Sequence, residues 1–427
     1  MILFARYPLP GGAKTRLIPS LGPTRAAHLQ RRMTEHACTI ARPTAAARHL
    51  DIEVRYAGGD RRRMRRWLGG EVHYARQGPG DLGQRMRRAF DAAFAEGCRR
   101  VVLVGTDCPA TTPQDLHRAF ESLADRDVVL GPSTDGGYWL IGLRRPAELF
   151  AGVAWSTPGV LAQTLARTRS LGQSVAVLRT LPDVDTFEDL SHVPATLLPP
   201  AAFVSVIIPA VNESQHMAAA ARSATADGAE VIVVDGGSTD ATPALAAEAG
   251  ARVIASPRGR AAQQNRGAAV ASGEVLLFLH ADTRLPRGYV DHVFDACGDP
   301  RVVGGAFEFA TDWRHPAMSV LAGLVRLRSR AMGLPYGDQG LWVRRAVFER
   351  LGGFADLAVA EDLDFVRRLK RCGRIVVAAA PAVTSARRWR QQGVLRTTLA
   401  NQLIVGGCYL GVPDRWLLRL RHSVGGP

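Results

Sequence analysis

Short runs of aliphatic and β-branched residues alternate with amphipathic stretches along most of this chain, and this alternation restricts the fold more than any other feature. In the first half the strand-like runs are 2–5, 52–56, 101–105, 128–130 and 175–178, and the helical patterns are 24–42, 82–96 and 113–123. Strands that are apolar throughout and separated by helices are typical of a mostly parallel sheet covered on both faces. The sequence therefore predicts an α/β fold for this half.

The second half repeats the pattern after an interruption. Its strand-like runs are 204–208, 231–235, 252–254, 275–280, 302–307 and 375–379, and its helical patterns are 213–225, 243–249, 260–271 and 361–372. Pro199 and Pro200 forbid a continuing helix between the halves. A chain of 427 residues suits two or three domains. We predict a domain over 1–196, a linker over 197–202 and a second domain over 203–427.

The chain is strongly basic, with 54 Lys and Arg against 39 Asp and Glu and a formal net charge of +15. Basic runs occur in both halves, at 61–66 and 387–390. A solvated surface, an anionic substrate or an anionic lipid surface would each account for this charge. We predict no nucleic-acid partner, because the sequence has neither a recognition-helix motif nor an aromatic-rich platform for single strands.

The six cysteines lie far apart and form no Cys-x-x-Cys pair, which argues against a zinc site or a disulfide framework and fits a reducing cytoplasm. No run reaches the ~18 apolar residues that a membrane-spanning helix needs, and the first residues lack the pattern of a signal peptide. The predicted location is cytoplasmic, with peripheral contact on the inner face of the membrane left open.

Ligands of such sheets bind beyond the carboxyl ends of the strands, so residues that follow a strand are the first candidates for chemistry. In the second half one strand ends in Asp235-Gly-Gly-Ser-Thr-Asp240, whose carboxylates can accept hydrogen bonds from a ribose or a base. Another leads into His280-Ala-Asp282, which an extended chain would place on one side and which can ligate a divalent cation. A buried histidine that hydrogen-bonds the aspartate is the structural alternative.

A third acidic feature is the pair Glu361-Asp362, at the start of a helical pattern with an apolar face. Acidic residues at that position complement the helix dipole, which is a sufficient structural reason for them. The functional alternative is a general base that removes a proton from an incoming hydroxyl group.

Residues of about 203–412 resemble a family 2 glycosyltransferase with the GT-A fold, because several motifs of that family occur in order. They are Ser205–Pro209 with Asn212-Glu213, Asp235–Asp240, Gly259–Gly267 with Ala271–Glu274, Leu279–Thr283, and Glu361-Asp362. The His-Ala-Asp-Thr sequence and Gly337-Asp338-Gln339-Gly340 are similar to the branch called selenodomain-associated transferase 2.

This resemblance implies a nucleoside-diphosphate sugar donor, a hydroxyl acceptor that a lipid carries in some cases, and inversion at the sugar. The implied nucleotide and phosphate contacts are Glu213, Asp235, Asp240 and Asn265, the implied metal ligands are His280 and Asp282, and the implied base is Asp362 or, second, Glu361. The cofactor would be Mn²⁺ or Mg²⁺. Because the first metal position is histidine and not aspartate, Mn²⁺ suits the site better.

The first half has charged strand ends of its own. A strand at 2–5 leads into Gly11-Gly12-Ala-Lys14-Thr-Arg16, where glycines and cations form a phosphate cradle. Asp107 and Asp185 each follow a strand-like run. A parallel sheet would bring them together on one cation, and two unrelated loop carboxylates are the alternative.

Together these residues resemble selenodomain-associated transferase 1, a family related to GT-A glycosyltransferases and nucleotidyltransferases, over nearly all of 1–195. The resemblance implies phosphate binding by Lys14 and Arg16 and metal binding by Asp107 and Asp185. Both halves would then be GT-A-like units in tandem. Gly78-Pro-Gly80-Asp-Leu-Gly83 matches a dinucleotide-binding fingerprint, but it does not follow the first strand, which argues against an NAD site.

Two stretches of the second half are apolar and basic. They are 313–333 and 394–410, the second followed by the basic segment 415–421. Each would pack as a core helix with exposed arginines or rest on an anionic leaflet.

The first hypothesis is a glycosyltransferase whose second half carries the transfer and whose first half is a related transferase, which would make the chain bifunctional. One alternative makes the first half a nucleotidyltransferase that supplies an activated intermediate. The other is a nucleotide-binding module with a degenerate catalytic centre.

Overall fold

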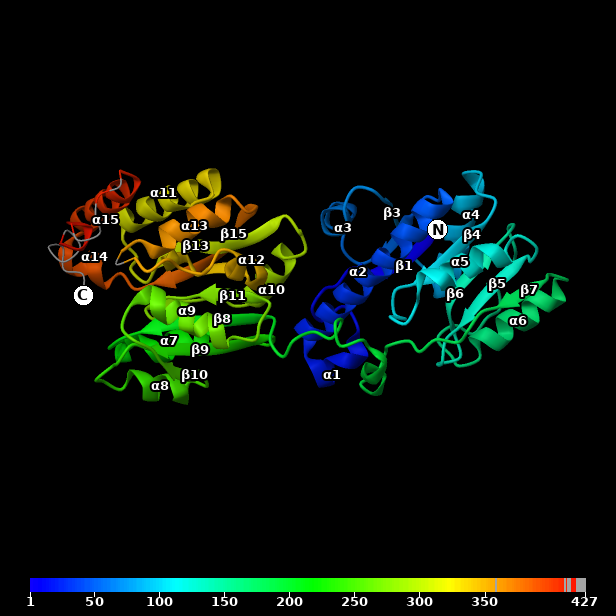
Figure 1. Ribbon diagram of the computed structural model, residues 1–427, viewed down its shortest axis with the longest axis horizontal. Helices are drawn as coiled ribbons and strands as arrows, with labels where there is room; N and C mark the ends of the chain where they lie inside the picture. The colour runs from blue at the N-terminus through cyan, green and yellow to red at the C-terminus, as the bar shows by residue number, and fades with distance from the viewer. Residues whose placement is uncertain (358, 411, 413–415, 420–427) are drawn as a thin grey trace. The chain divides into compact units, whose positions relative to one another are not determined.

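The computed structural model describes residues 1–357, 359–410, 412 and 416–419. Its contacts divide the chain into two compact units, Met1–Pro199 and Pro200–Pro427. This division falls within the segment 197–202 that the sequence predicts as a linker. Each unit has one central sheet with helices packed against it (Figure 1).

The first unit contains a seven-stranded sheet. Its strands are β1 (Ile2–Arg6), β2 (Glu53–Ala57), β3 (His73–Arg76), β4 (Val101–Gly105), β5 (Val128–Pro132), β6 (Tyr138–Leu143) and β7 (Val175–Val177). Its helices are α1 (Ile18–Leu21), α2 (Pro23–Arg48), α3 (Arg61–Leu68), α4 (Leu82–Ala95), α5 (Pro113–Ser122) and α6 (Val160–Ser170), with 3₁₀ turns η1 (Thr15–Leu17) and η2 (Glu188–His192).

The second unit contains an eight-stranded sheet. Its strands are β8 (Val204–Ala210), β9 (Ala229–Asp235), β10 (Arg252–Ala255), β11 (Val275–Phe278), β12 (Thr283–Arg284), β13 (Val302–Thr311), β14 (Leu341–Arg344) and β15 (Arg374–Thr384). Its helical segments are α7 (Ser214–Ala224), α8 (Thr242–Glu248), α9 (Arg260–Val270), α10 (Tyr289–Ala296), α11 (Pro316–Met332), η3 (Gly337–Gln339), α12 (Arg345–Arg350), α13 (Glu361–Lys370), α14 (Arg387–Gln392) and α15 (Val394–Tyr409).

The two sheets have the same topology. The strand order is β3-β2-β1-β4-β6-β5-β7 in the first unit and β10-β9-β8-β11-β14-β13-β15 in the second, which adds β12 at one edge. In the first sheet β6 is antiparallel to both of its neighbours, and in the second sheet β14 is. The other pairings that the two sheets have in common are parallel. The predicted α/β fold with mostly parallel sheets is therefore confirmed, and one arrangement of strands is used twice.

The core lies on both faces of each sheet. Along β1 and β4, Leu3 and Val102 pack with residues of α2 and α5, whereas Ile2 and Val101 pack with residues of α4. Successive side chains of a strand point to opposite faces, so strands that are apolar throughout need helices on both sides. Because β1, β2 and β4 are parallel, their carboxyl ends and the loops that follow lie at one edge of the sheet.

One predicted helix is shorter than the real one. The pattern predicts a helix over 24–42, but α2 continues to Arg48 and contains Pro43. Ala41 and Ala45 are fully or almost fully buried on either side of this proline. Burial of this face therefore offsets the backbone hydrogen bond that the proline cannot donate.

Candidate functional site

In the second unit, three segments that lie far apart in the sequence bring charged side chains to one place. His280 and Asp282 follow β11, Asp338 lies in η3, and α13 begins with Glu361 and Asp362. Burial, with a contribution from the nearby carboxylates of Asp362 and Asp282, raises the pKa of Asp338 to about 6 against the opposing effect of Arg328. Carboxylates change one another's pKa in this way only when they lie close together, so these three lie in one region of the second unit.

The turn after β11 differs from the prediction in one detail. The strand ends at Phe278, and a turn in which the Thr283 N–H donates to the His280 carbonyl (3.0 Å) carries Asp282. His280 and Asp282 therefore do not lie on one side of an extended strand. The Asp282 carbonyl accepts the N–H of Ser385 at 3.0 Å, which fixes the turn against the end of β15.

Gly337 is the residue that lies between the predicted metal ligand and the predicted base. Its N–H donates to Asp362 Oδ2 at 2.7 Å. A Cβ atom at this position would lie 2.8 Å from His280 Nε2 and 3.0 Å from Asp362 Oδ2. The Gly337 position therefore lies close to both His280 and Asp362, and an added side chain would have to displace them.

The two members of the acidic pair have different surroundings. Glu361 is 2% exposed and its carboxylate lies 3.3 Å from the Arg260 guanidinium. Burial raises the pKa of Glu361, and Arg260 opposes that rise. Asp362 is half-buried and accepts backbone N–H groups from Gly337 and Leu363. Asp362 is thus held in place and remains reachable by a substrate, which favours it over Glu361 as the base.

Two arginines that the sequence analysis did not single out complete the cluster. Arg260, at the start of α9, lies in the field of Glu361, Asp362 and Asp282, which together raise its pKa against the effect of burial. Arg388 of α14 is half-buried near Asp282 and Arg260, and burial followed by Arg260 lowers its pKa. Within the described part of the chain, no hydrogen bond or ion pair is formed by the Arg388 guanidinium. It is a cation held near carboxylates and has no partner among the residues that the structure describes.

The other predicted nucleotide contacts are distributed over nearby loops. Asp235, at the end of β9, accepts the N–H groups of Gly237 and Ser238, and Asp240 accepts those of Ser214 and Thr242. These bonds shape the two loops and lower the pKa of Asp240.

Glu213 has one carboxylate oxygen on the Arg387 guanidinium at 2.7 Å and a second, buried oxygen without a partner among the described residues. The amide of Asn265 donates to the carbonyl of Phe354 and accepts its N–H, both at 2.9 Å. Asn265 therefore holds a loop through both ends of its amide, whereas Glu213 has an oxygen left to bind a ligand.

Gly337→Ala should lower turnover of the donor about 100-fold without lowering the melting temperature by more than a few degrees. The added methyl group must displace His280 and Asp362, and a misplacement of ~1 Å costs about that factor. The matched control is Gly323→Ala in α11, where a Cβ meets no atom within 4 Å and should stabilise the helix by about 1 kcal/mol. Equal turnover of the two variants would remove Gly337 from the site.

The first unit has a cavity of about 650 Å³ at the carboxyl ends of its strands. Residues from β1, β4 and β6 and from the loops around them line it, including all four predicted residues, Lys14, Arg16, Asp107 and Asp185. Its other charged residues are Arg6, Arg85, Asp135 and Asp183, and its aromatic residues are Phe4, Tyr138, Trp139 and Trp155. The cavity thus combines a charged part with an aromatic part and has the size of a small-molecule site.

Lys14 lies between the two predicted metal ligands. Its Nζ is 3.0 Å from Asp185 Oδ1 and 3.7 Å from Asp107 Oδ2, and its side chain is only 5% exposed. Its backbone has φ 47°, a left-handed conformation that directs the side chain into the cavity between loops. Arg16 contacts the other oxygen of Asp185 at 3.3 Å. The predicted phosphate-binding cations therefore neutralise the predicted metal-binding carboxylates.

Asp183 is a member of this cluster that the sequence analysis did not assign. Burial and, after it, the carboxylates of Asp135, Asp185 and Asp107 together raise its pKa from 3.8 to about 6. Between about pH 4 and pH 6 the native state therefore keeps this proton, whereas the unfolded chain loses it. The free energy of unfolding falls as pH rises through that window and stays at the lower value above it.

Asp183→Asn should accordingly raise the melting temperature of the first unit, by an amount that grows from pH 4 to pH 6 and is constant above it. The measurement is calorimetry of the full chain across that range. The control is Asp125→Asn, since the Asp125 side chain is 74% exposed. A pH-independent difference between Asp183→Asn and the parent would contradict the raised pKa.

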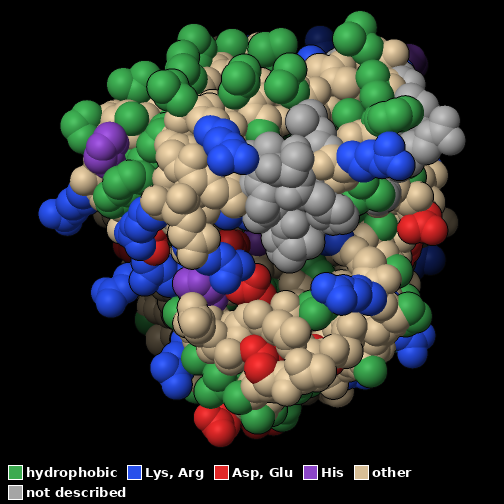
Figure 2. Space-filling view, turned by 90° about the vertical axis from the view of Figure 1, so that its left-hand side faces the viewer, with side chains coloured by type: hydrophobic (Ala, Val, Ile, Leu, Met, Phe, Trp, Pro, Cys, Tyr) green, Lys and Arg blue, Asp and Glu red, His purple; other side chains and the backbone are tan. Residues whose placement is uncertain are grey.

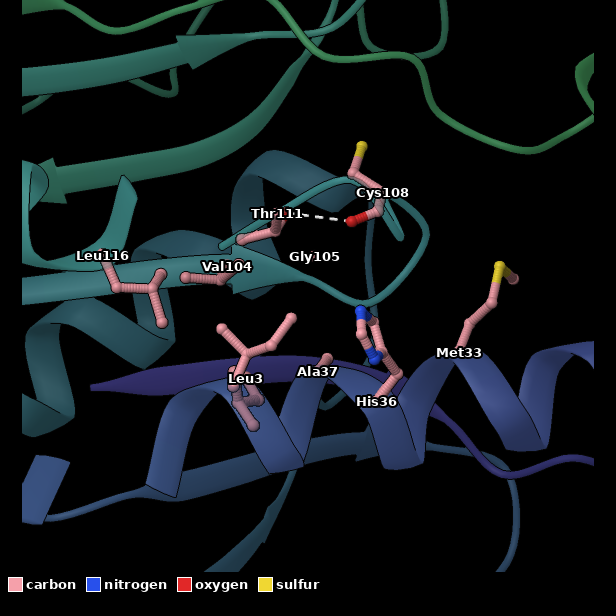
Figure 3. A pocket seen from close by; sticks show the side chains of 10 residues that line it. Leu3, Met33, His36, Ala37, Val104, Gly105, Cys108, Thr111 and Leu116 are labelled. Atoms are coloured by element: carbon pink, nitrogen blue, oxygen red, sulfur yellow. Dashed lines mark hydrogen bonds between the residues drawn. The ribbon is translucent and has the colours of Figure 1, made fainter. Parts of the chain in front are cut away.

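Figure 3 shows a second cavity of about 10 Å³, where Met33 and His36 of α2 face the loop after β4. His36 Nε2 lies 3.1 Å from the Pro109 carbonyl, and Thr111 donates to the Cys108 carbonyl at 2.9 Å. Burial raises the pKa of the Cys108 thiol. The space holds at most one water molecule, so we assign it to packing and not to ligand binding.

The glycine pattern at 78–83 also has a structural explanation. Asp81 and Gln84 form a capping box at the start of α4, and Gly80 has φ 94°. A Cβ at Gly83 would lie 2.3 Å from Trp155 Nε1. These glycines thus admit a turn and an indole ring, which is consistent with the argument against an NAD site.

Two family models match the chain. Residues 205–352 match glycosyl transferase family 2, and residues 40–157 match the family described as uncharacterized protein conserved in bacteria (DUF2064). A 2-phospho-L-lactate guanylyltransferase of Methanopyrus kandleri is 37% identical over 94 residues, which cover 21% of this chain and 46% of that protein. A phosphoenolpyruvate guanylyltransferase of Chloroflexus aurantiacus is 29% identical over 179 residues, which cover 39% of this chain and 80% of that protein. The chain thus spans about half the length of the first relative.

Solved structures with similar folds include two that cover about half of this chain. A structure from Desulfovibrio desulfuricans G20, assigned to the nucleotide-diphospho-sugar transferases, is 35% identical, covers 46% of this chain and 85% of its own, and has a TM-score of 0.43. A mannosyltransferase from Pyrobaculum calidifontis in complex with GDP-Man and Mn²⁺ is 21% identical, covers 53% of this chain and 74% of its own, and has a TM-score of 0.36.

The fold and the charged strand ends resemble those of transferases of the nucleotide-diphospho-sugar type. More particularly, residues 40–157 are similar to DUF2064 and residues 205–352 to glycosyl transferase family 2, one match within each unit. The resemblance stated from the sequence is confirmed for both halves.

Proposed function

We propose that the second unit transfers a sugar from a nucleoside diphosphate to a hydroxyl acceptor with inversion, and that Asp362 is its base. The Asp362 carboxylate takes the proton of the acceptor hydroxyl, the acceptor oxygen forms the bond to the anomeric carbon, and the bond to the diphosphate breaks with its electron pair. Arg388 and Arg260 supply positive charge where the diphosphate becomes more negative.

The residues present fit a divalent cation that is shared with the donor. In the residues that the structure describes, no three His, Cys, Asp or Glu side chains are arranged to hold one metal ion. Asp282 and His280 would provide two ligands, and diphosphate oxygens and water the others, which is the usual way that Mg²⁺ and Mn²⁺ bind at such sites. When bound, the cation would offset charge on the leaving diphosphate. Asp338 Oδ1, buried and without a hydrogen-bond partner, is a further oxygen nearby.

The observation that supports the proposal is the closeness of Gly337 to both His280, of the predicted metal motif, and Asp362, the proposed base. The test is a panel of nucleotide sugars with and without Mn²⁺, read by thermal shift of the full chain and by release of the nucleoside diphosphate. We expect one or a few donors to raise the melting temperature only with the metal. A panel without any metal-dependent shift would contradict the proposal.

For the first unit we propose nucleotidyl transfer, because its cavity places Lys14 and four aspartates beside an aromatic wall. The two guanylyltransferase relatives agree with this choice in name. The test is release of pyrophosphate from a nucleoside triphosphate, abolished by Asp107→Ala and unchanged by Asp362→Asn. Tight nucleotide binding without release would instead support a degenerate binding module.

A further inference from the structure

Two helices of the second unit leave a row of large apolar side chains in solvent. On α11 they are Val320, Leu324 and Leu327, and on α15 they are Leu395, Leu399 and Leu403. Leu395 is 86% exposed and Leu327 is 65% exposed. Figure 2 shows hydrophobic side chains gathered along the upper edge of this unit, where Figure 1 places α11 and α15. We call these six residues the α11–α15 face.

The spacing shows that this face is a second apolar surface of the helices, separate from the one that packs inward. The exposed residues recur at intervals of four and three on α11 and of four on α15, and so lie on one side of each helix. The inward sides are formed by other residues, Met318 and Ser329 on α11 and Thr397 and Ala400 on α15, all buried. A soluble surface rarely keeps contiguous apolar side chains of this size without a partner.

The helices of the face are basic, although acidic groups of neighbouring elements pair with some of their arginines, Glu213 with Arg387 and Asp312 with Arg390. The helices α11, α14 and α15 contain several arginines and no acidic residue. Glu308 of β13 is the acidic group that pairs with α11, at 2.6 Å from Arg330 and 3.9 Å from Arg326. Near the end of the chain, the exposed Trp416 has the Arg419 guanidinium 5.0 Å above its ring. Of the predicted basic segment 415–421, the structure describes residues 416–419 only.

We infer that the α11–α15 face docks on the surface of an anionic lipid bilayer. Leucines on one side of a helix with arginines beside them, and an exposed tryptophan with a cation, match the apolar and charged layers of such a surface. The contact is peripheral, because none of the described helices is long and apolar enough to cross a membrane.

The face also lies on the elements that contribute cations to the candidate site. The Arg328 guanidinium of α11 stacks 3.6 Å above the ring of Tyr336, the neighbour of Gly337, and α14 carries Arg388 immediately before α15. A bilayer bound here would therefore be close to the proposed transfer site, and an acceptor carried by a lipid could reach it. Binding itself does not depend on the proposed glycosyl transfer.

The experiment is flotation of the full chain with vesicles of phosphatidylcholine, with and without phosphatidylglycerol, at low and high salt. We expect binding to the vesicles that contain phosphatidylglycerol, weakened by salt. Leu324→Glu combined with Leu399→Glu should weaken it about 100-fold, since each leucine loses the free energy of apolar transfer. Both side chains are exposed, so the fold is not at risk.

The control is Leu171→Glu combined with Val177→Glu, which changes two exposed apolar residues of the first unit. It should bind vesicles as the parent does. Three results would overturn the inference: no binding of the parent, equal binding to both kinds of vesicle, or equal binding of the Leu324/Leu399 variant. Light scattering tests for a fourth such result. If the parent is a dimer and the Leu324/Leu399 variant is a monomer, the face is an interface between two copies of the chain.

Discussion

Asp362→Asn is expected to lower the rate of sugar transfer by about 10³-fold, within the usual range for a general base, and to leave binding of the nucleoside diphosphate unchanged. The asparagine keeps the size of the side chain and an oxygen that can accept the N–H of Gly337 or Leu363, but it cannot take a proton. Single-turnover kinetics and calorimetric titration of the diphosphate separate the two effects.

The matched control for that variant is Asp364→Asn on the same helix. The Asp364 carboxylate pairs with Arg368 at 2.8 Å, in an i,i+4 ion pair away from the site. Helix ion pairs of this kind contribute about 0.3–0.5 kcal/mol to the free energy of unfolding. Loss of the pair should therefore leave the fold intact, and turnover should not change. If Asp362→Asn and Asp364→Asn had the same rate, the base would have to be assigned elsewhere, with Glu361 next.

Arg388→Gln should lower kcat/KM for the donor about 100-fold and weaken binding of the nucleoside diphosphate. The guanidinium is held near Asp282 and Arg260 and forms no ion pair with any described residue, so a diphosphate would bind it as a strong partner. Loss of charge-assisted hydrogen bonds costs about 1.5–3 kcal/mol, which corresponds to this factor. Arg388→Lys should recover part of the loss, since it keeps the charge and not the forked geometry.

Arg390→Gln controls for the removal of an arginine from α14. Arg390 already pairs with Asp312 at 3.2 Å and is near the Trp313 ring, so it has its partners before any ligand binds. Donor binding by this variant should equal that of the parent. Unchanged diphosphate affinity in Arg388→Gln would show that the diphosphate lies elsewhere.

Much of the architecture follows from the sequence because the parallel strands are buried on both faces and so carry continuous apolar runs. The antiparallel strands β6 and β14 were not among the predicted runs. β14 has only four residues and β6 begins with two aromatic residues and contains Gly142. Both are defined by pairing with strands distant in the chain, and periodicity cannot detect such pairing.

The site could be predicted in part for a similar reason. Carboxylates such as Asp107, Asp185 and Asp282 follow strands, and the topology brings strand ends together. Arg388 gave no local signal, because it is one arginine within a basic run. The position of Gly337 beside Asp362 depends on tertiary contacts of η3 and is visible only in the fold.

The central claim is that acidic groups from distant segments of the second unit converge on one site for a nucleoside diphosphate. Its most direct measurement is calorimetric titration of UDP and GDP, with and without Mn²⁺, into the full chain and into Asp282→Asn and Asp107→Asn. We predict a metal-dependent binding event that Asp282→Asn abolishes and Asp107→Asn retains. Binding of the diphosphate that survives both in Asp282→Asn and in Asp282→Asn combined with Asp107→Asn, with the same affinity and metal dependence, would contradict the account.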